Sequence, residues 1–303
     1  MKIHSLRHKL TWNQKRRLTG LAFLLPLSAF LIVFIVYPLV SVIFYSLFDW
    51  NGISGMKFVG TQNYKLLPAT EGFWEMAKAT VVYAAGVTGL VVLCGFLLAL
   101  ALDKQGRGRI NRTLMRFFWF FPCLLSGAIV GIIWRIMFTY NGGLVNFLLN
   151  QAGIRSVNWL ETYGVTMAAV IIASVWGQIG MCAIIFLAGL QNIPTDMLEA
   201  ADLDGAGELQ KKIRIVIPLM APSITINVIT TSIAAFKAYE LPYTVSKGLP
   251  GYSTRILTQR IYFYSFSTNK YGIASAMSVL LVIVITLISL VQLYVLKKRE
   301  DVY

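Results

Sequence analysis

Few side chains in this sequence are of the types that catalyse reactions, and their spacing does not assemble them into a site. Both histidines, His4 and His8, lie in the basic segment at the start of the chain. The cysteines Cys94, Cys123 and Cys182 all fall in apolar stretches without metal-ligand spacing, so we interpret them as small core residues. No glycine–lysine loop that would cradle a phosphate occurs. The sequence therefore predicts a non-enzymatic chain with no catalytic residue, no metal site and no cofactor of its own.

A second group of useful side chains is polar or aromatic and lies inside or beside apolar segments. Trp176 and Gln178 are close in one such segment, and an aromatic face beside an amide suits a polyhydroxy ligand. Asn227 lies in the next apolar segment, where an amide needs several hydrogen-bond partners. The alternative is that these groups bond only neighbouring helices or their own backbone. The residues that we assign to a substrate path are Trp176, Gln178, Asn227, Thr231, Tyr239 and Glu240.

A polar stretch at residues 191–222 separates two strongly apolar segments. Proline, threonine and aspartate at 194–196 are typical of a helix start, because proline is tolerated there and acidic groups suit that end of the helix dipole. Gly205 stands where this helix needs a left-handed residue to end. We predict a short helix, a glycine turn, and a second helix that starts near Ala206 and bends near Pro218. On spacing alone, a solvated loop with some local helix explains the stretch equally well.

The composition indicates a membrane protein. Of the 303 residues, 57% are hydrophobic and 13% charged, and the mean hydropathy is +0.67. A soluble domain carries about 25% charged residues. The apolar residues gather into stretches of roughly 20 residues or more, which is the length needed to cross a bilayer. We therefore predict an all-α polytopic membrane protein with six transmembrane helices.

The expected organisation has five parts along the chain. They are a cytoplasmic basic N-terminus at 1–18, a first transmembrane helix at 19–47, an outer loop at 48–78, a core at 79–296, and a cytoplasmic tail at 297–303. The further spans are predicted at 79–102, 117–138, 164–190, 215–235 and 272–296. The segment between the last two spans is predicted to be a loop, broken by Pro242 and by the KGLPG run at 247–251.

The distribution of basic residues predicts the orientation. With the N-terminus inside, seventeen of the 27 lysine and arginine residues fall in inside segments and nine in outside segments, and Arg135 lies within a span. Because basic residues concentrate in cytoplasmic loops, both termini and the polar stretch at 191–222 are expected in the cytoplasm. The net charge of +14 has the same explanation and does not indicate nucleic-acid binding. The spans hold almost no central ionisable residue, which argues against an ion-driven carrier.

The residue pattern of the inside stretch resembles the EAA loop of bacterial ATP-binding-cassette importer permeases. The positions that match that pattern in register are Glu199, Ala200, Ala201, Asp204, Gly205, Ala206, Ile215, Pro218 and Pro222. The sequence departs from it at Leu209, Lys212 and Ile213, where sugar permeases often carry aromatic residues. Further segments similar to carbohydrate-uptake permeases of the maltose, multiple-sugar and glycerol-phosphate type are 58–64, 106–109, 131–134, 249–254 and 271–278.

This resemblance implies a type I importer permease fold in a bacterial inner or plasma membrane. It implies a second homologous permease subunit, two cytoplasmic ATPase subunits that bind ATP-Mg, and an extracytoplasmic solute-binding protein. The short helix before Gly205 is then a coupling helix. If the fifth span lines the path, the stripe Ser223, Asn227, Thr230 and Thr231 is expected to face the second permease. The solute implied is a sugar. The alternatives are a permease for a polyol or glycerol phosphate, and an ATPase-independent carrier or channel.

Overall fold

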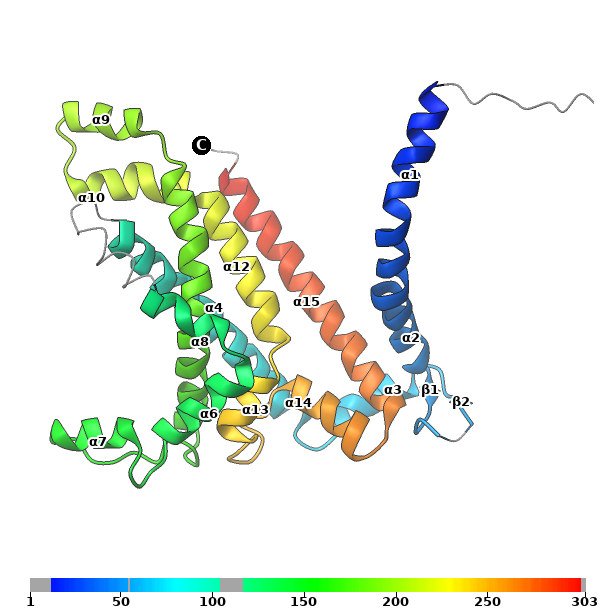
Figure 1. Cartoon of the computed structure of the whole chain (residues 1–303). Helices are drawn as coiled ribbons and strands as arrows, with labels where there is room; N and C mark the ends of the chain where they lie inside the picture. The colour runs from blue at the N-terminus through cyan, green and yellow to red at the C-terminus, as the bar shows by residue number, and fades with distance from the viewer. Residues whose placement is uncertain (1–11, 54, 104–116, 301–303) are drawn as a thin grey trace, which may run out of the picture.

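The computed structural model of the chain describes residues 12–53, 55–103 and 117–300. The basic head up to residue 11, the basic turn at 104–116 and the last residues at 301–303 lie outside the described residues. Four helices are long and apolar enough to cross a membrane, and two bent helix pairs bring the number to six if each pair is one span. The predicted all-α polytopic architecture is therefore confirmed, and Figure 1 shows the helices running roughly side by side.

The centre of the bundle is the contact between α4 (Phe73–Asp103) and α8 (Val165–Gln191). Small residues allow the two backbones to approach closely, since a Cβ atom built on Gly95 would lie 2.7 Å from the Cys182 Sγ. Farther along the contact, the Tyr83 hydroxyl lies 2.9 Å from the Ser174 hydroxyl, so each polar group has a partner inside the apolar core. Two more helices, α12 (Ala221–Phe236) and α15 (Tyr271–Glu300), complete the bundle.

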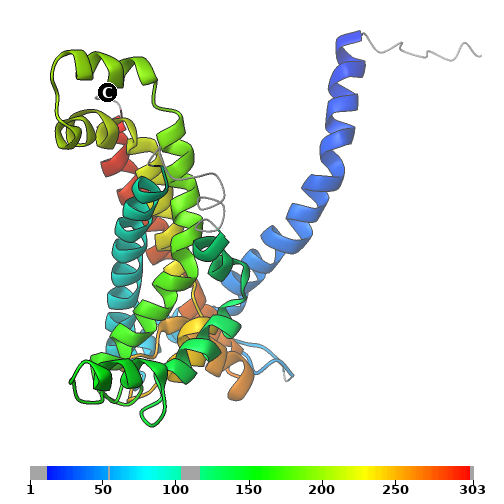
Figure 2. The ribbon, with the colours of Figure 1, turned by 60° about the vertical axis from the view of Figure 1, so that its left-hand side comes forward.

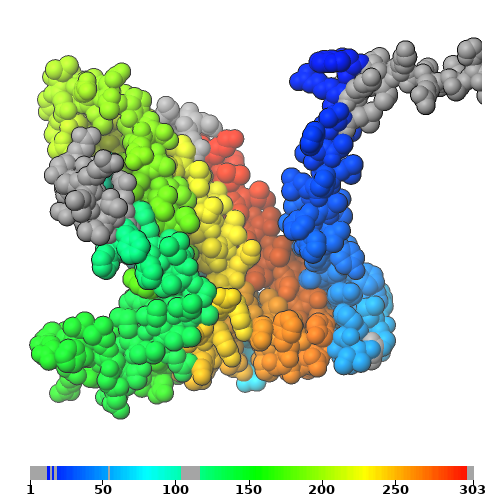
Figure 3. Space-filling model, viewed as in Figure 1, coloured from blue at the N-terminus to red at the C-terminus, as the bar shows by residue number. Residues whose placement is uncertain are grey.

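The first helix forms an arm that stands away from this bundle. It runs through α1 (Trp12–Leu31), a π-helical segment (Ile32–Val36) and α2 (Tyr37–Tyr45). No residue of its apolar window is buried, and Figures 1, 2 and 3 show it separated from the other long helices except near its end. There α2 contacts α15. The arm occupies the position predicted for the first span.

The segment after the arm fastens it to the bundle. It consists of an antiparallel pair and two short helical turns, namely β1 (Phe48–Asp49), β2 (Lys57–Phe58), α3 (Gln62–Leu66) and a 3-10 turn (Leu67–Ala69). The Asn63 amide donates hydrogen bonds to the backbone oxygens of Ser46 (2.8 Å) and Phe48 (2.9 Å). The Tyr64 hydroxyl donates to the Ser46 hydroxyl at 2.7 Å. The FVGTQNY run at 58–64 therefore holds the end of the arm in place.

Two predicted boundaries in the first half of the core are wrong. The helix α4 begins at Phe73 rather than at residue 79, because the polar residues before 79 extend the helix beyond its apolar part. The predicted third span at 117–138 is not one helix. Its first half, Phe117–Leu124, ends in a 3-10 turn (Phe121–Leu124), and its second half is α6 (Gly127–Met137). The two halves meet at an angle of 111°. Pro122 lacks a backbone N–H, and Ser126 caps the new helix by accepting from the Ile129 N–H, so the chain restarts there.

The second half of the core also departs from the prediction. The fifth span is bent by 63° at Met220, where α10 (Glu208–Lys211), a π-helical segment (Lys212–Val216) and α11 (Ile217–Leu219) give way to α12. Prolines on both sides of Met220 explain the break. The segment at 236–271, predicted to be a loop, contains α13 (Glu240–Ser246), α14 (Leu257–Tyr262) and a π-helical turn (Phe263–Ser267). Pro242 lies in the first turn of α13, where proline is tolerated, so it does not break the chain.

The remaining helices define the two ends of the bundle. Beyond the end of α8, α9 (Thr195–Leu203) and α10 project at the same end at which α1 begins and α15 finishes (Figure 1). At the opposite end lie α3, α7 (Leu144–Gln151), α13 and α14. The start of the arm, the end of α15 and the polar stretch at 191–222 therefore share one side of the molecule, as six crossings require.

Candidate functional site

Two adjoining pockets lie between α8, α12 and the broken third span. The first, which we name the end pocket, has a volume of about 530 Å³ and reaches α13. The second, the mid pocket, has a volume of about 320 Å³ and lies deeper along α8 and α12. Both are lined by Cys123, Gly177, Gln178 and Ala234, so the two pockets adjoin, and we refer to them together as the hollow. The hollow leads from the α13 end of the bundle toward the middle of α12.

Five of the six residues assigned to a substrate path line this hollow. Gln178 lines both pockets, Asn227 and Thr231 line the mid pocket, and Tyr239 and Glu240 line the end pocket. The Asn227 amide is buried and donates one long hydrogen bond of 3.4 Å to the Cys182 backbone oxygen. The structure thus brings together polar groups from a range of 62 positions in the sequence, from Gln178 to Glu240. Their arrangement suits a polar solute.

Trp176 is the exception, because it does not line either pocket. Its ring packs edge-on against Trp134 of α6, with the ring centroids 6.0 Å apart. A residue two positions from Gln178 on a helix points to a different side, since neighbours at that spacing do not share a face. Trp176 therefore belongs to the contact between α6 and α8.

Three of the four residues of the polar stripe of the fifth span line the mid pocket, namely Asn227, Thr230 and Thr231. Asn227 and Thr231 are buried within the chain, whereas Thr230 is exposed and donates to the Ile226 backbone oxygen at 2.7 Å. Ser223 packs against Gly189 of α8, where a Cβ atom would overlap its hydroxyl. Ser223 therefore lies at the contact between α8 and α12, apart from the other three residues, and the expectation that the stripe faces a second permease stays a prediction.

Sequence reasoning did not assign several residues of the hollow to the substrate path, among them Lys237, Cys123 and Gly127. Lys237 lines the end pocket directly after α12, and Cys123, interpreted as a core residue, lines both pockets and donates to the Phe120 backbone oxygen at 2.9 Å. Gly127 places the first turn of α6 beside Glu240, since its Cβ position lies 3.5 Å from the Glu240 Oε2. A basic residue at the end of a span was the available signal for Lys237. The other two depend on the break in the third span.

The second candidate site is the turn that ends α9. Gly205 has φ +76°, as predicted from its place after the helix. The Ala206 N–H donates to the Ala201 backbone oxygen at 2.9 Å, and the Gly205 N–H donates to the Asp202 backbone oxygen at 3.1 Å. These two bonds form a Schellman motif, in which a left-handed residue lets the final carbonyls of a helix find donors. The turn fixes the direction in which the chain leaves α9.

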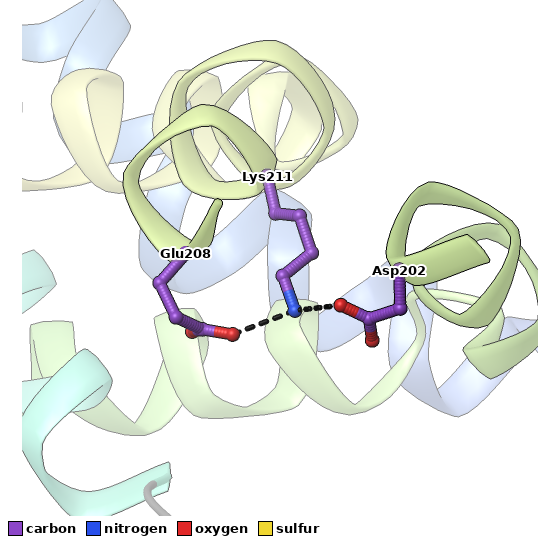
Figure 4. Close-up of polar contacts among 3 residues, drawn as sticks. All are labelled: Asp202, Glu208 and Lys211. Atoms are coloured by element: carbon purple, nitrogen blue, oxygen red, sulfur yellow. Dashed lines mark hydrogen bonds and ion pairs between the residues drawn. The ribbon is translucent and has the colours of Figure 1, made fainter. Parts of the chain in front are cut away.

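One lysine joins α9 to the helix that follows the turn. Lys211 Nζ lies 2.6 Å from the Asp202 Oδ1 on α9 and 2.6 Å from the Glu208 Oε1 on α10 (Figure 4). The hydrogen bonds to Asp202 and then to Glu208 raise the pKa of the Lys211 ammonium, so it stays charged. Asp202 and Glu208 are both exposed, so this bridge orients the two helices more than it stabilises the fold.

Two large apolar side chains are exposed on the helical elbow, by which we mean α9, the turn at Gly205 and α10. Leu203 is 91% exposed and Leu209 is 71% exposed, while Glu199 and Ala200 also face solvent. Ala201 faces inward with 9% exposure, and Asp204 is the exposed C-cap residue. Pro218 lies farther along, next to the bend at Met220. The predicted coupling residues therefore divide between an exposed surface, the turn and the bend.

Comparison with known proteins places these features in a family. The sequence profile of the binding-protein-dependent transport system inner membrane component family matches residues 91–301. A trehalose/maltose transport system permease protein of Thermococcus litoralis is 31% identical, with 98% of this chain and 99% of that protein covered. A probable starch degradation products transport system permease protein of Thermoanaerobacterium thermosulfurigenes is 30% identical, with 92% and 94% covered.

The fold is also similar to a solved structure. One chain in the crystal structure of a bacterial alginate ABC transporter, in complex with an alginate pentasaccharide-bound periplasmic protein, superimposes with a TM-score of 0.82. It is 21% identical, with 96% of this chain and 98% of that chain covered. The arm and the elbow are thus included in a fold that a solved structure shares nearly end to end.

Proposed function

The chain belongs to the family of binding-protein-dependent transport system inner membrane components, and on this premise we propose that it is a permease subunit of an ATP-driven sugar importer. The observation that carries the proposal is the hollow of two adjoining pockets with Gln178, Asn227 and Thr231 on its wall. Amide and hydroxyl groups both donate and accept hydrogen bonds, as the hydroxyl groups of a sugar do. The two relatives, which are named for trehalose/maltose and for starch degradation products, support the same solute class.

The elbow of α9 and α10 is the proposed contact with an ATPase subunit. Leu203 and Leu209 are large apolar side chains exposed on a segment that projects from the bundle, and such patches mark protein interfaces. In this proposal Glu199, Ala200 and Asp204 lie at the rim of that contact, with ATP-Mg bound by the partner subunits. A helix inserted into a groove of the ATPase transmits its closure to the permease.

A helical connection links the elbow to the hollow, so movement of the elbow can reach the residues that line it. The Schellman turn and Lys211 fix α9 to α10, and the helix from Glu208 continues through the bend at Met220 into α12. Asn227 and Thr231 lie on α12. Rotation of the elbow therefore displaces one wall of the hollow relative to α8, which opens it toward one side of the membrane or the other. A second homologous permease supplies the remaining wall, and an extracytoplasmic binding protein delivers the solute.

The charges of the end pocket favour a neutral solute over glycerol phosphate. Lys237 is accompanied by Glu240 in the same pocket, so the two formal charges cancel. An anion would meet the Glu240 carboxylate, whereas sugar hydroxyl groups can use both charged groups. A polyol remains compatible with this pocket, and the sugar assignment rests on the relatives.

The proposal is tested by transport in proteoliposomes that contain the complete complex with its ATPases and loaded binding protein. We expect uptake of maltose or maltohexaose with ATP and none with ADP. Glycerol 3-phosphate is the comparison solute. Uptake that continues without ATP would favour an independent carrier, and uptake of glycerol 3-phosphate alone would overturn the sugar assignment.

The orientation is tested by cysteine labelling in intact cells. Thr61 and Leu203 are both exposed, but they lie at opposite ends of the bundle. In a chain whose native cysteines are replaced by alanine, Thr61→Cys should react with an impermeant maleimide added outside. Leu203→Cys should react only after permeabilisation in cells without the ATPase, because it then faces the cytoplasm. Labelling of Leu203→Cys in intact cells would reverse the proposed topology.

The role of the Asn227 amide is tested by Asn227→Ala. We expect uptake to fall about tenfold, the effect of losing roughly 1.4 kcal/mol of interaction with the solute. The melting temperature should change little, because the amide makes one hydrogen bond of 3.4 Å and interhelical bonds in membranes contribute on the order of 0.6 kcal/mol.

The matched control for this variant is Thr225→Val on the same helix. Thr225 is equally buried but lines neither pocket, and its hydroxyl bonds the Ala221 backbone oxygen of its own helix. Uptake by Thr225→Val should equal that of the wild type. A lower melting temperature for Asn227→Ala, with an unchanged ratio of two competing sugars, would show that the amide serves only helix packing.

A further inference from the structure

Four aromatic rings form a row at the α13–α14 end of the bundle. Tyr239 stacks against Tyr243 with ring centroids 5.5 Å apart and an interplanar angle of 10°. On its other side Tyr239 stacks against Tyr262 at 4.8 Å, and Tyr262 contacts Phe266 at 4.9 Å. We name this set the aromatic row. It links α13 to α14 and the π-helical turn after α14.

The aromatic row is open to a ligand along its length. Tyr243 and Tyr262 are each 45% exposed and Phe266 is 68% exposed, although every ring contacts at least one other. Three of the four rings carry a hydroxyl group. Tyrosine provides a large rigid apolar surface with a polar edge, which is the combination that contacts the C–H and O–H groups of a sugar.

The row is continuous with the end pocket, because Tyr239 belongs to both. The same pocket holds Lys237 and Glu240, and neither makes an ion pair with any residue that the structure describes. One unpaired cation beside one unpaired anion favours a neutral ligand that can donate and accept hydrogen bonds. A stack that served only to anchor the chain at the membrane surface would have no reason to share a ring with a polar pocket.

We propose that the aromatic row binds the sugar units of a neutral oligosaccharide that extend beyond the end pocket. The inference rests on the proposed function and names its solute more closely. The row comprises three successive ring-to-ring contacts of 4.8–5.5 Å, so one sugar unit touches only part of it. Each added unit contacts another ring, and the benefit of the row therefore grows with the length of the chain that is transported.

The test compares maltose with maltohexaose in proteoliposomes that contain the complete importer with saturating, sugar-loaded binding protein. Tyr262→Leu interrupts the row without touching either pocket. We expect its uptake rate for maltohexaose to fall about tenfold and that for maltose to change less than about twofold. Tyr262→Phe keeps the ring and should retain most of the maltohexaose rate. Tyr140→Leu is the control, since Tyr140 is exposed but lies outside the row.

The outcomes separate the inference from the function on which it rests. Equal losses for both sugars in Tyr262→Leu, at full assembly of the complex, would mean that the row contacts the binding protein, and would overturn the inference. Unchanged transport of both sugars by Tyr262→Leu would also overturn the inference. The same holds if the wild-type complex imports maltose but not maltohexaose. A wild-type complex that imports neither sugar contradicts the proposed function itself.

Discussion

Gly205→Val is expected to leave the chain inserted in the membrane while uptake falls roughly 5- to 30-fold. Gly205 has φ +76°, and an L-residue pays about 1–2 kcal/mol to adopt that conformation. A cost of this size changes the population of a correctly formed turn by roughly 5- to 30-fold. With the turn lost, the Schellman bonds to Ala201 and Asp202 open, and the exposed apolar surface of the elbow loses its direction.

Gly207→Val provides a control that isolates the effect of backbone strain at position 205 from the effect of adding a valine side chain to the elbow. Neither glycine has any atom within 4 Å of its Cβ position, so valine fits both sites in space. Gly207 has φ −69°, which any residue adopts without strain. The measurements are ATP-dependent uptake and co-purification of the ATPase with the permease. Equal behaviour of the two variants, whether both active or both inactive, would contradict a requirement for the left-handed turn.

Gly95→Leu is expected to lower the melting temperature of the purified chain by several degrees and to reduce its yield. The Cβ atom alone would lie 2.7 Å from the Cys182 Sγ and 3.4 Å from the Ala183 backbone nitrogen. Overpacking at such a contact costs about 1–3 kcal/mol, and here it forces apart α4 and α8, the two helices at the centre of the bundle.

Two further variants separate this packing effect from a general effect of leucine in α4. Gly89 lies on the same helix with nothing within 4 Å of its Cβ position, so Gly89→Leu should retain the wild-type melting temperature. In the double variant Gly95→Ala/Cys182→Gly the added methyl group replaces the side chain that it would overlap, and stability should return in part. Equal destabilisation by leucine at positions 89 and 95 would count against the close contact.

The long helices could be predicted from hydropathy because a span must satisfy its own backbone in lipid. The same rule cannot detect the 111° break at residues 121–127, since both halves and the turn between them are apolar. It also placed the start of α4 too late, because Glu75 and Lys78 are polar yet helical. Hydropathy reports which residues lie in the membrane, and it does not report where a helix restarts within it.

In the candidate sites, too, local features could be predicted from the sequence, whereas contacts between separate helices could not. The turn at Gly205 could be predicted because its geometry depends on a few consecutive residues. Asn227 could be singled out because a buried amide is costly without partners. Which residues share the hollow with it depends on the broken third span, and this is why Cys123 and Gly127 were missed and why Trp176 packs against Trp134 instead of lining the hollow. The contact between Lys211 and Asp202 likewise required the positions of two separate helices.

A π-helical segment at Lys212–Val216 lies on the route from the elbow to α12. Its wider turns replace the regular hydrogen bonds of an α-helix, and Pro218 leaves one carbonyl of this stretch without its usual donor. Amide protons here should exchange with solvent faster than those of α8, which has neither feature. We therefore expect the link between the elbow and α12 to bend more easily than a regular α-helix, so that it takes up part of any displacement of the elbow relative to α12.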